Sequence, residues 1–189
     1  MKLFLITIIF FITSCSSWST IPSDQTNACS IIKNKRSWYR ALQKTEKKWG
    51  ITKGTQLSFI LTESNFRPRA KTQREYIFGF IPSGRLSSAF GYAQAIDSTW
   101  EWYKKSTNNR YASRTSFRDS TDFIGWYITQ SEKKLNLSKN DVYNHYLAYH
   151  QGHKGFKNRS YAKKPNLISV AKKTARKSIV FEEQLKKCR

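Results

Sequence analysis

Apolar residues recur every three or four positions through most of the chain, which is the pattern of amphipathic helices. Between Arg36 and Trp49 they gather on one side, and Gly50 supplies a stop signal. Residues 55–64 keep the same spacing, and Asn65 and Pro68 are expected to end that segment. These two stretches predict the first long helices.

The second half of the chain predicts four further helices. Residues 98–101 read Ser-Thr-Trp-Glu, a capping-box pattern that opens a short helix. Residues 119–135 and 138–152 carry helical periodicity, the latter ending at a glycine. Pro165 fits the first turn of a last helix that runs to about Cys188.

Residues 66–95 lack helix signals and contain several glycine and proline residues. They predict a loop or a small hairpin that turns at Pro82-Ser83-Gly84. The expected fold class is therefore mainly α (α+β), with one small irregular or hairpin insert.

The N-terminus determines the expected compartment. A basic start precedes an apolar run over residues 3–12, which is shorter than the roughly 20 residues that span a bilayer and fits a secretory signal. The small residues before Cys15 resemble the lipobox of bacterial lipoproteins, in which this cysteine becomes the acylated N-terminus. The alternative is an ordinary signal peptide cut near Ser17, which would remove Cys15.

These features divide the chain into a signal peptide (1–15), a polar linker (16–28) and one folded domain (29–189). We expect a monomer in the periplasm, held to the membrane through the lipid. Because Ser16 is not aspartate, the resemblance to lipoproteins implies sorting to the outer membrane of a Gram-negative cell envelope.

Two further cysteines, Cys29 and Cys188, lie near the ends of the expected domain. An even pair in an exported protein predicts a disulfide. The alternative is two free thiols, which are uncommon outside the reducing cytosol.

The chain is strongly basic, with 34 Lys and Arg against 12 Asp and Glu, a net charge of +22. Such a charge fits nucleic acid, an anionic envelope polymer, or a lysine-rich surface with no specific partner. The basic residues are scattered along the chain, and export argues against a nucleic-acid partner. An acidic cell wall is the expected partner.

One carboxyl group is a candidate for catalysis. Glu63 lies at the C-terminal end of the apolar helix over 55–64, beside Phe59, Ile60 and Phe66. The negative end of the helix dipole and apolar surroundings both favour the protonated form. A general acid for glycosidic cleavage needs that form near neutral pH. The alternative is an ordinary surface glutamate near a helix end.

Three segments carry a family resemblance. Residues 63–70 (Glu-Ser-Asn-Phe-Arg-Pro-Arg-Ala), 91–95 (Gly-Tyr-Ala-Gln-Ala) and 148–152 (Ala-Tyr-His-Gln-Gly) resemble, in order, three motifs of the soluble lytic transglycosylase (SLT) family. The resemblance spans about residues 57–156, within a chain that looks like a divergent lipoprotein member of the lysozyme-like superfamily.

The resemblance implies a lysozyme-like helical fold and cleavage of the β-1,4 bond between N-acetylmuramic acid and N-acetylglucosamine. In that family one glutamate protonates the glycosidic oxygen and then takes the proton of the muramic C6 hydroxyl. The substrate's acetamido group acts as internal nucleophile, and the product carries a 1,6-anhydro end. The partner is the peptidoglycan glycan strand, and no cofactor is expected.

The motifs carry over residue by residue. Glu63 takes the acid/base role, and Ser64 assists near the substrate or the helix end. Gly91 would let the backbone approach the sugar, Gln94 would line the cleft, and Tyr149 would orient Glu63 through its hydroxyl. For Ser64 the alternative is a simple helix cap, and for Tyr149 a core aromatic.

The sequence also departs from the family pattern. Tyr92-Ala93 replaces Leu-Met, His150 replaces Asn, and the gap between Glu63 and Gly91 is long. These departures leave two other functions open: a hydrolytic muramidase on the same fold, and a peptidoglycan-binding lipoprotein without turnover.

Three other groups of residues have competing interpretations. The histidines lack an acidic or cysteine neighbour, so no metal site is expected. Three aspartates could supply a second carboxylate, although two lie where helix caps are expected. Several aromatic residues could stack on sugars but fit core positions. These groups are His145, His150 and His153; Asp97, Asp119 and Asp122; and Trp100, Trp102, Tyr103 and Trp126.

Overall fold

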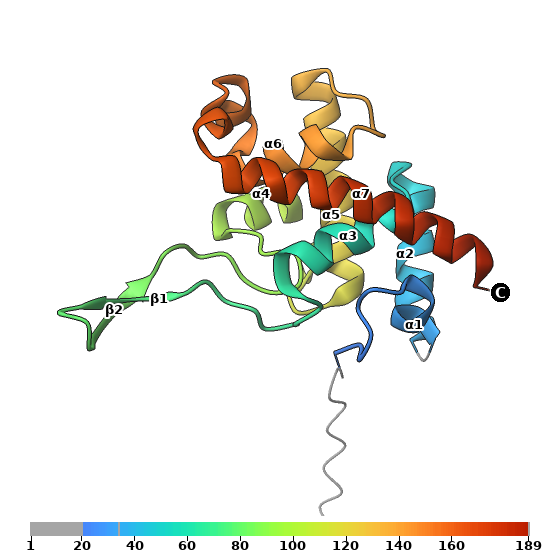
Figure 1. Ribbon diagram of the computed structural model, residues 1–189, viewed down its shortest axis with the longest axis horizontal. Coiled ribbons are helices and arrows are strands. Elements are labelled where there is room, and N and C mark those ends of the chain that lie inside the picture. The colour runs from blue at the N-terminus through green and yellow to red at the C-terminus, as the bar shows by residue number, and fades with distance from the viewer. Residues whose placement is uncertain (1–20, 34, 189) are drawn as a thin grey trace, which may run out of the picture.

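Figure 1 shows the computed structural model, which describes residues 21–33 and 35–188. The described residues form seven α-helices, one short 3-10 helix and a two-stranded antiparallel sheet, so the mainly α (α+β) prediction is confirmed. The expected signal peptide, with Cys15, lies outside the described residues. The elements are α1 Ala28–Lys33, α2 Arg36–Trp49, α3 Lys53–Ser64, β1 Arg74–Ile77, β2 Ile81–Arg85, α4 Asp97–Thr107, α5 Phe117–Leu135, α6 Val142–Lys157, η1 Ser160–Lys163 and α7 Pro165–Lys187.

Helix α2 follows the predicted pattern closely. Trp38, Leu42 and Thr45 are buried on its inner face, which packs against α5. Gly50 ends the helix at φ 72°, and its N–H donates to the carbonyl oxygen of Glu46. Only glycine adopts this left-handed conformation without a steric penalty, so the stop signal has the expected cause.

Helices α3 and α7 make the most extensive contact between any two of the described helices. Gly54 permits this approach, because a Cβ added there would lie 2.3 Å from the backbone oxygen of Ser178. Pro165 opens α7 at its first turn, as predicted, and the helix runs across α3 from end to end (Figure 1). The N-terminus of α3 is capped by the Thr52 hydroxyl, which accepts from the N–H of Thr55.

The hydrophobic core joins α2, α3, α5, α6 and α7 in one cluster. Trp100, Tyr103 and Trp126 belong to it with exposures of 4%, 0% and 1%, so these aromatic residues are core residues. Trp102 packs against Trp126 from a partly buried position. None of the described helices is long and apolar enough to cross a membrane.

Cys29 on α1 and Cys188 after α7 form a disulfide, with their Cα atoms 5.5 Å apart, as predicted. The bond links two segments that lie 159 positions apart in the sequence. It therefore fastens the short α1 to the C-terminal end of the long α7.

The hairpin insert is present, but its predicted turn was wrong. Pro82, Ser83 and Gly84 lie within β2, and the turn falls at Phe78-Gly79-Phe80. Phe78 and Gly79 adopt left-handed φ values of 53° and 79°. A phenylalanine in that region is uncommon, so the Pro-Ser-Gly sequence gave the stronger and misleading signal.

Two helix boundaries also differ from prediction. Helix α4 starts at Asp97 after Ile96, with no side-chain cap, so the capping box at residues 98–101 was wrong. Helix α6 begins after Asp141, whose side chain accepts from the N–H of Asn144. Gly152 interrupts α6 at φ 70° and ψ 162°, and a further turn continues to Lys157.

Candidate active site

A cleft of about 500 Å³ lies between the end of α3, the segments flanking the hairpin, α5 and α6. Glu63, Gln94, Tyr149 and His150 all line it. Three of the residues singled out in the sequence therefore meet with Glu63 in one cavity. Glu63 is the only acidic residue among those that line this cleft in the described part of the chain.

The Glu63 carboxyl sits in a desolvated position. The residue is partly exposed, but its Oε1 is buried and has no hydrogen-bond partner among the described residues. Burial raises the pKa of Glu63 to about 7, and a hydrogen bond from the Tyr146 hydroxyl acts in the opposite direction. The carboxyl group is thus partly protonated near neutral pH, as the sequence predicted from its apolar surroundings.

Aromatic rings provide those surroundings. Phe59 precedes Glu63 by one helical turn and meets the rings of Tyr146 and Tyr149 edge to face, at centroid distances of 5.4 and 5.3 Å. Tyr127 packs against Tyr149 at 5.0 Å. This wall of rings displaces water from one side of the carboxyl group, which is the physical cause of the raised pKa.

The sequence analysis did not identify Tyr146 as a site residue. It lies one turn before Tyr149 on α6, so both side chains face α3. The hydroxyl expected to orient Glu63, that of Tyr149, donates instead to the carbonyl oxygen of Ala93. The hydrogen bond to Glu63 comes from Tyr146. Helical spacing from Tyr149 was the only sequence signal for this residue.

A chain of hydrogen bonds joins the three motif segments. The Gln94 amide donates to the carbonyl oxygens of Ala70 and Gly91, and the N–H of Gly91 donates to Ala70. Tyr149 adds the bond to Ala93. The ends of the first, second and third motifs therefore meet around the cleft.

The backbone conformation and close packing at position 91 explain why a glycine stands there. It adopts φ 81°, and a Cβ added there would lie 2.1 Å from the carbonyl oxygen of Arg114. That same oxygen accepts from the N–H of Tyr92 and from the hydroxyl of Ser120. A glycine is therefore required at this position because the backbone passes too close to Arg114 to leave room for a side chain.

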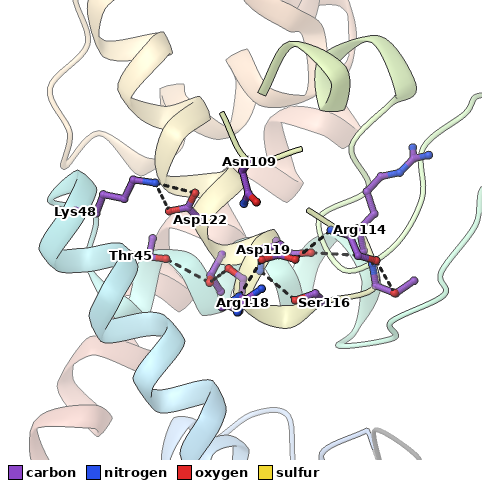
Figure 2. Close-up of polar contacts among 12 residues, drawn as sticks. Thr45, Lys48, Asn109, Arg114, Ser116, Arg118, Asp119 and Asp122 are labelled. Atoms are coloured by element: carbon purple, nitrogen blue, oxygen red, sulfur yellow. Dashed lines mark hydrogen bonds and ion pairs between the residues drawn. The ribbon is translucent and has the colours of Figure 1, made fainter. Parts of the chain in front are cut away.

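Figure 2 shows the polar network that holds Arg114 and the start of α5 in place. Asp119 accepts from the N–H of Ser113 and from the guanidinium of Arg118, while Ser116 caps the helix by accepting from the N–H of Asp119. This network fixes the surface on which the Gly91 turn rests.

The three aspartates considered as a second carboxylate all lie outside the cleft lining. Asp97 pairs with Arg114 at 2.7 Å, and Asp119 belongs to the network above. Asp122 accepts from Lys48, at 3.0 Å, and from the Tyr103 hydroxyl (Figure 2 shows the pair with Lys48). Each is committed to a structural contact.

Ser64 is buried, and its hydroxyl donates to the carbonyl oxygen of Ile60. Its own carbonyl accepts from the backbone and side chain of Arg67. Its contacts are those of the helix end, where the sequence analysis had placed one of its two roles.

The three histidines have separate surroundings. Nε2 of His145 bonds the Ser138 carbonyl, His153 bonds the Ser131 hydroxyl, and His150 lines the cleft. Among the described residues no group of three or more His, Cys, Asp and Glu side chains is placed to hold a metal ion.

Comparison with known families agrees with this geometry. A comparison with curated proteins gave no match. The family model described as "Transglycosylase SLT domain" matches residues 3–188, almost the whole chain. Proteins of this type act on peptidoglycan in the cell envelope. The protein therefore belongs to the transglycosylase SLT domain family, as a lysozyme-like member.

Proposed function

We propose that this protein is a peptidoglycan lytic transglycosylase in which Glu63 is the single catalytic acid and base. One observation carries the proposal. Glu63 is the only carboxyl group among the described residues that line the cleft, and burial brings its pKa to about 7. Such a group can hold a proton before the reaction and accept one after it.

The first half of the reaction needs an acid. A protonated Glu63 carboxyl donates to the glycosidic oxygen between N-acetylmuramic acid and N-acetylglucosamine, and that bond breaks. The buried Oε1 has no hydrogen-bond partner among the described residues, which disfavours the ionised carboxylate and so favours the protonated form that this transfer needs. The wall formed by Phe59, Tyr127 and Tyr149 keeps water from stabilising the ionised form beforehand.

The second half needs a base. The muramic acetamido oxygen bonds to the anomeric carbon as the leaving group departs, and the C6 hydroxyl then displaces it. The Glu63 carboxylate takes the proton of that hydroxyl, which restores the protonated carboxyl and closes a 1,6-anhydro ring. No water is consumed.

The residues that line the cleft favour this series of reaction steps over hydrolysis by a pair of carboxylates. Most glycosidases pair an acid with a second carboxylate about 5–9.5 Å away, which serves as nucleophile or activates water. Asp97, Asp119 and Asp122 are engaged elsewhere, outside the cleft. A substrate acetamido group takes over the role that the second carboxylate would have.

The remaining motif residues have supporting roles in this proposal. Gln94 lines the cleft beside the glycan, and Gly91 holds the turn that presents it. Tyr149 anchors the same turn through Ala93. Ser64 closes the helix that carries Glu63, and Tyr146 positions the carboxyl group itself.

Mass spectrometry of purified peptidoglycan after digestion tests the proposal. The expected product is a set of muropeptides with 1,6-anhydromuramic ends, and Glu63→Gln should abolish them. Reducing ends in their place would identify a hydrolytic muramidase. Binding to peptidoglycan sacculi without any product would identify a non-catalytic binding protein.

We also propose that the chain is cleaved between Ser14 and Cys15, is anchored through a lipid on Cys15, and faces the periplasm from the outer membrane. The lipobox-like sequence before Cys15 supports this. A palmitate analogue fed to the cells should label the wild type and not Cys15→Ser. Equal labelling of both proteins would exclude the anchor.

A further inference from the structure

The β-hairpin is the most unusual surface feature of the protein. It projects from the helical body, at the left of the view in Figure 1. Every residue of β1 and β2 is exposed, so neither face of this sheet packs on the core. An isolated two-stranded hairpin is marginally stable in water, and large exposed apolar groups usually mark an interaction site.

Its polarity changes along its length. Arg74 and Arg85 pair across the strands at the base. Ile77 and Ile81 pair next to the turn, and the tip exposes Phe78 by 84% and Phe80 by 74%. The hairpin is thus amphipathic from base to tip, whereas a hairpin that docks on a protein surface usually has one apolar face and one polar face.

The strand edges are unsuited to pairing with another protein chain. Pro82 lies within β2 and has no N–H to donate, and a bulge interrupts β1 between Glu75 and Tyr76. Both features block the addition of a further strand. The N–H of Phe80 donates to the carbonyl oxygen of Ile77, so the turn satisfies part of its own backbone.

Basic residues gather at the base of the hairpin. Arg69 and Lys71 are exposed on the segment that leads into the hairpin, close in sequence to Arg74 of β1. Arg85 lies across from Arg74 on β2, and Glu75 is the single acidic residue of β1 and β2. A cationic base below an aromatic tip matches the headgroup and upper acyl regions of an anionic bilayer.

We propose that the tip of this hairpin, Ile77 to Ile81, inserts into the interfacial region of an anionic phospholipid membrane. The two phenylalanines bury their rings among the upper acyl chains, and the arginines at the base contact phosphate groups. This inference rests on the hairpin alone and does not depend on the reaction at Glu63.

Insertion of the hairpin tip would hold the cleft at a set distance from the membrane. Thr72 and Ser87, at the base of the hairpin, both line the cleft. Strand residues rise by about 3.3 Å each, so the cleft residue Thr72 lies at most roughly 20 Å from the inserted Phe78, and closer than that to the lipid surface. The glycan within reach would be the strands that lie next to the membrane.

Fluorescence quenching in the full-length protein tests the insertion. Phe78→Trp and the control Tyr111→Trp each add one tryptophan at a highly exposed site. Both are mixed with vesicles of phosphatidylcholine and phosphatidylglycerol that carry bromine on their acyl chains. Relative to the unchanged protein, the added tryptophan should be strongly quenched at position 78 and unquenched at position 111. Equal quenching at the two positions, or none at 78, would overturn the proposal.

Two further variants separate lipid from glycan. Arg74→Glu should reduce the quenching at position 78 by several-fold, and vesicles of phosphatidylcholine alone should reduce it similarly. If purified peptidoglycan protects position 78 from a soluble quencher while vesicles do not quench it, the hairpin binds glycan and the membrane proposal is wrong. Retained muropeptide release by Phe78→Trp would show that the fold and the cleft are intact in either case.

Discussion

The hydroxyl of Tyr146 on α6 donates a hydrogen bond to the carboxyl of Glu63 at the end of α3. This bond favours the ionised carboxylate, whereas burial favours the protonated acid. The pKa of about 7 is the balance of the two, with burial as the larger effect. Tyr146 therefore keeps a buried carboxyl group within the range where one residue can serve as acid and then as base.

Glu63→Gln is expected to remove nearly all turnover. The amide keeps the shape of the side chain but neither donates a proton to the leaving oxygen nor accepts one from the C6 hydroxyl. A positioned acid/base contributes about 10²–10⁴-fold, and the loss should be at least of that order because Glu63 performs both transfers. Release of soluble muropeptides measures it, with binding to sacculi as the control for an intact cleft. Near-normal release would exclude Glu63.

The same substitution should raise stability at alkaline pH. The pKa of Glu63 is raised in the folded state, so the unfolded chain loses its proton first as pH rises from 4.5 towards 7. Ionisation therefore destabilises the wild type in this window, and by pH 8 the cost is of the order of 3 kcal/mol. Glu63→Gln escapes that cost.

Denaturant unfolding at pH 4 and pH 8 checks this. The two proteins should have similar free energies of unfolding at pH 4, and Glu63→Gln should be the more stable of the two at pH 8. A constant difference between them at both pH values would show that the pKa of Glu63 is not raised.

Tyr146→Phe should move the pH profile of the reaction. In the wild type, activity requires the protonated carboxyl and should decline above about pH 7. Loss of the Tyr146 hydroxyl removes the bond that favours the carboxylate, so the pKa of Glu63 rises and the decline shifts to higher pH. Initial rates between pH 5 and 9 measure the shift.

Tyr149→Phe is the matched control for that experiment. Its hydroxyl bonds Ala93, so its removal should lower stability by about 1 kcal/mol and leave the decline of the pH profile in place. If Tyr149→Phe moves the decline and Tyr146→Phe does not, Tyr149 is the residue that tunes Glu63.

The helices and the burial of Glu63 could be predicted because they depend on local sequence, whereas the disulfide could be predicted from the number of cysteines and the expected export of the chain. Gly50 and Pro165 mark helix boundaries through their own backbone restrictions, and burial of Glu63 follows from its apolar neighbours on α3. An exported protein with Cys29 and Cys188 left over predicts their pairing.

The contacts that tune the site could not be predicted, because they join distant segments. Tyr146 and Tyr149 have the same side chain and lie on the same face of α6, and only tertiary packing decides which hydroxyl reaches Glu63 and which reaches Ala93. The position of the hairpin turn was predicted wrongly for a different reason. Phe78 accepts a left-handed conformation that its residue type disfavours, while Pro82 and Gly84 carry the usual turn signals.

Gly91→Ala is expected to destabilise the protein by about 2–4 kcal/mol, since the new Cβ would meet the Arg114 carbonyl at 2.1 Å and φ is 81°. Gly79→Ala is the control, because it has a similar φ of 79° with nothing within 4 Å. It should cost only about 1 kcal/mol. Thermal unfolding of both variants measures the difference. Equal losses would mean that backbone strain, and not contact with Arg114, explains Gly91.

The Cys29–Cys188 bond should contribute much of the stability of the protein. Its cysteines are 159 positions apart, and a loop of that length corresponds to about 5 kcal/mol in the chain-entropy treatment. Replacing both cysteines by alanine, or reducing the wild type, should therefore lower the free energy of unfolding by a few kcal/mol, because strain and residual structure reduce the ideal figure.

Denaturant unfolding with and without reductant provides the measurement. Reductant should move the wild-type midpoint down to that of the double variant, and the variant itself should not respond. Neither cysteine lines the cleft, so muropeptide release at low temperature should survive in both. If reductant leaves the wild-type midpoint unchanged, then the link between α1 and α7 does not hold the folded state together, and helix packing alone does so.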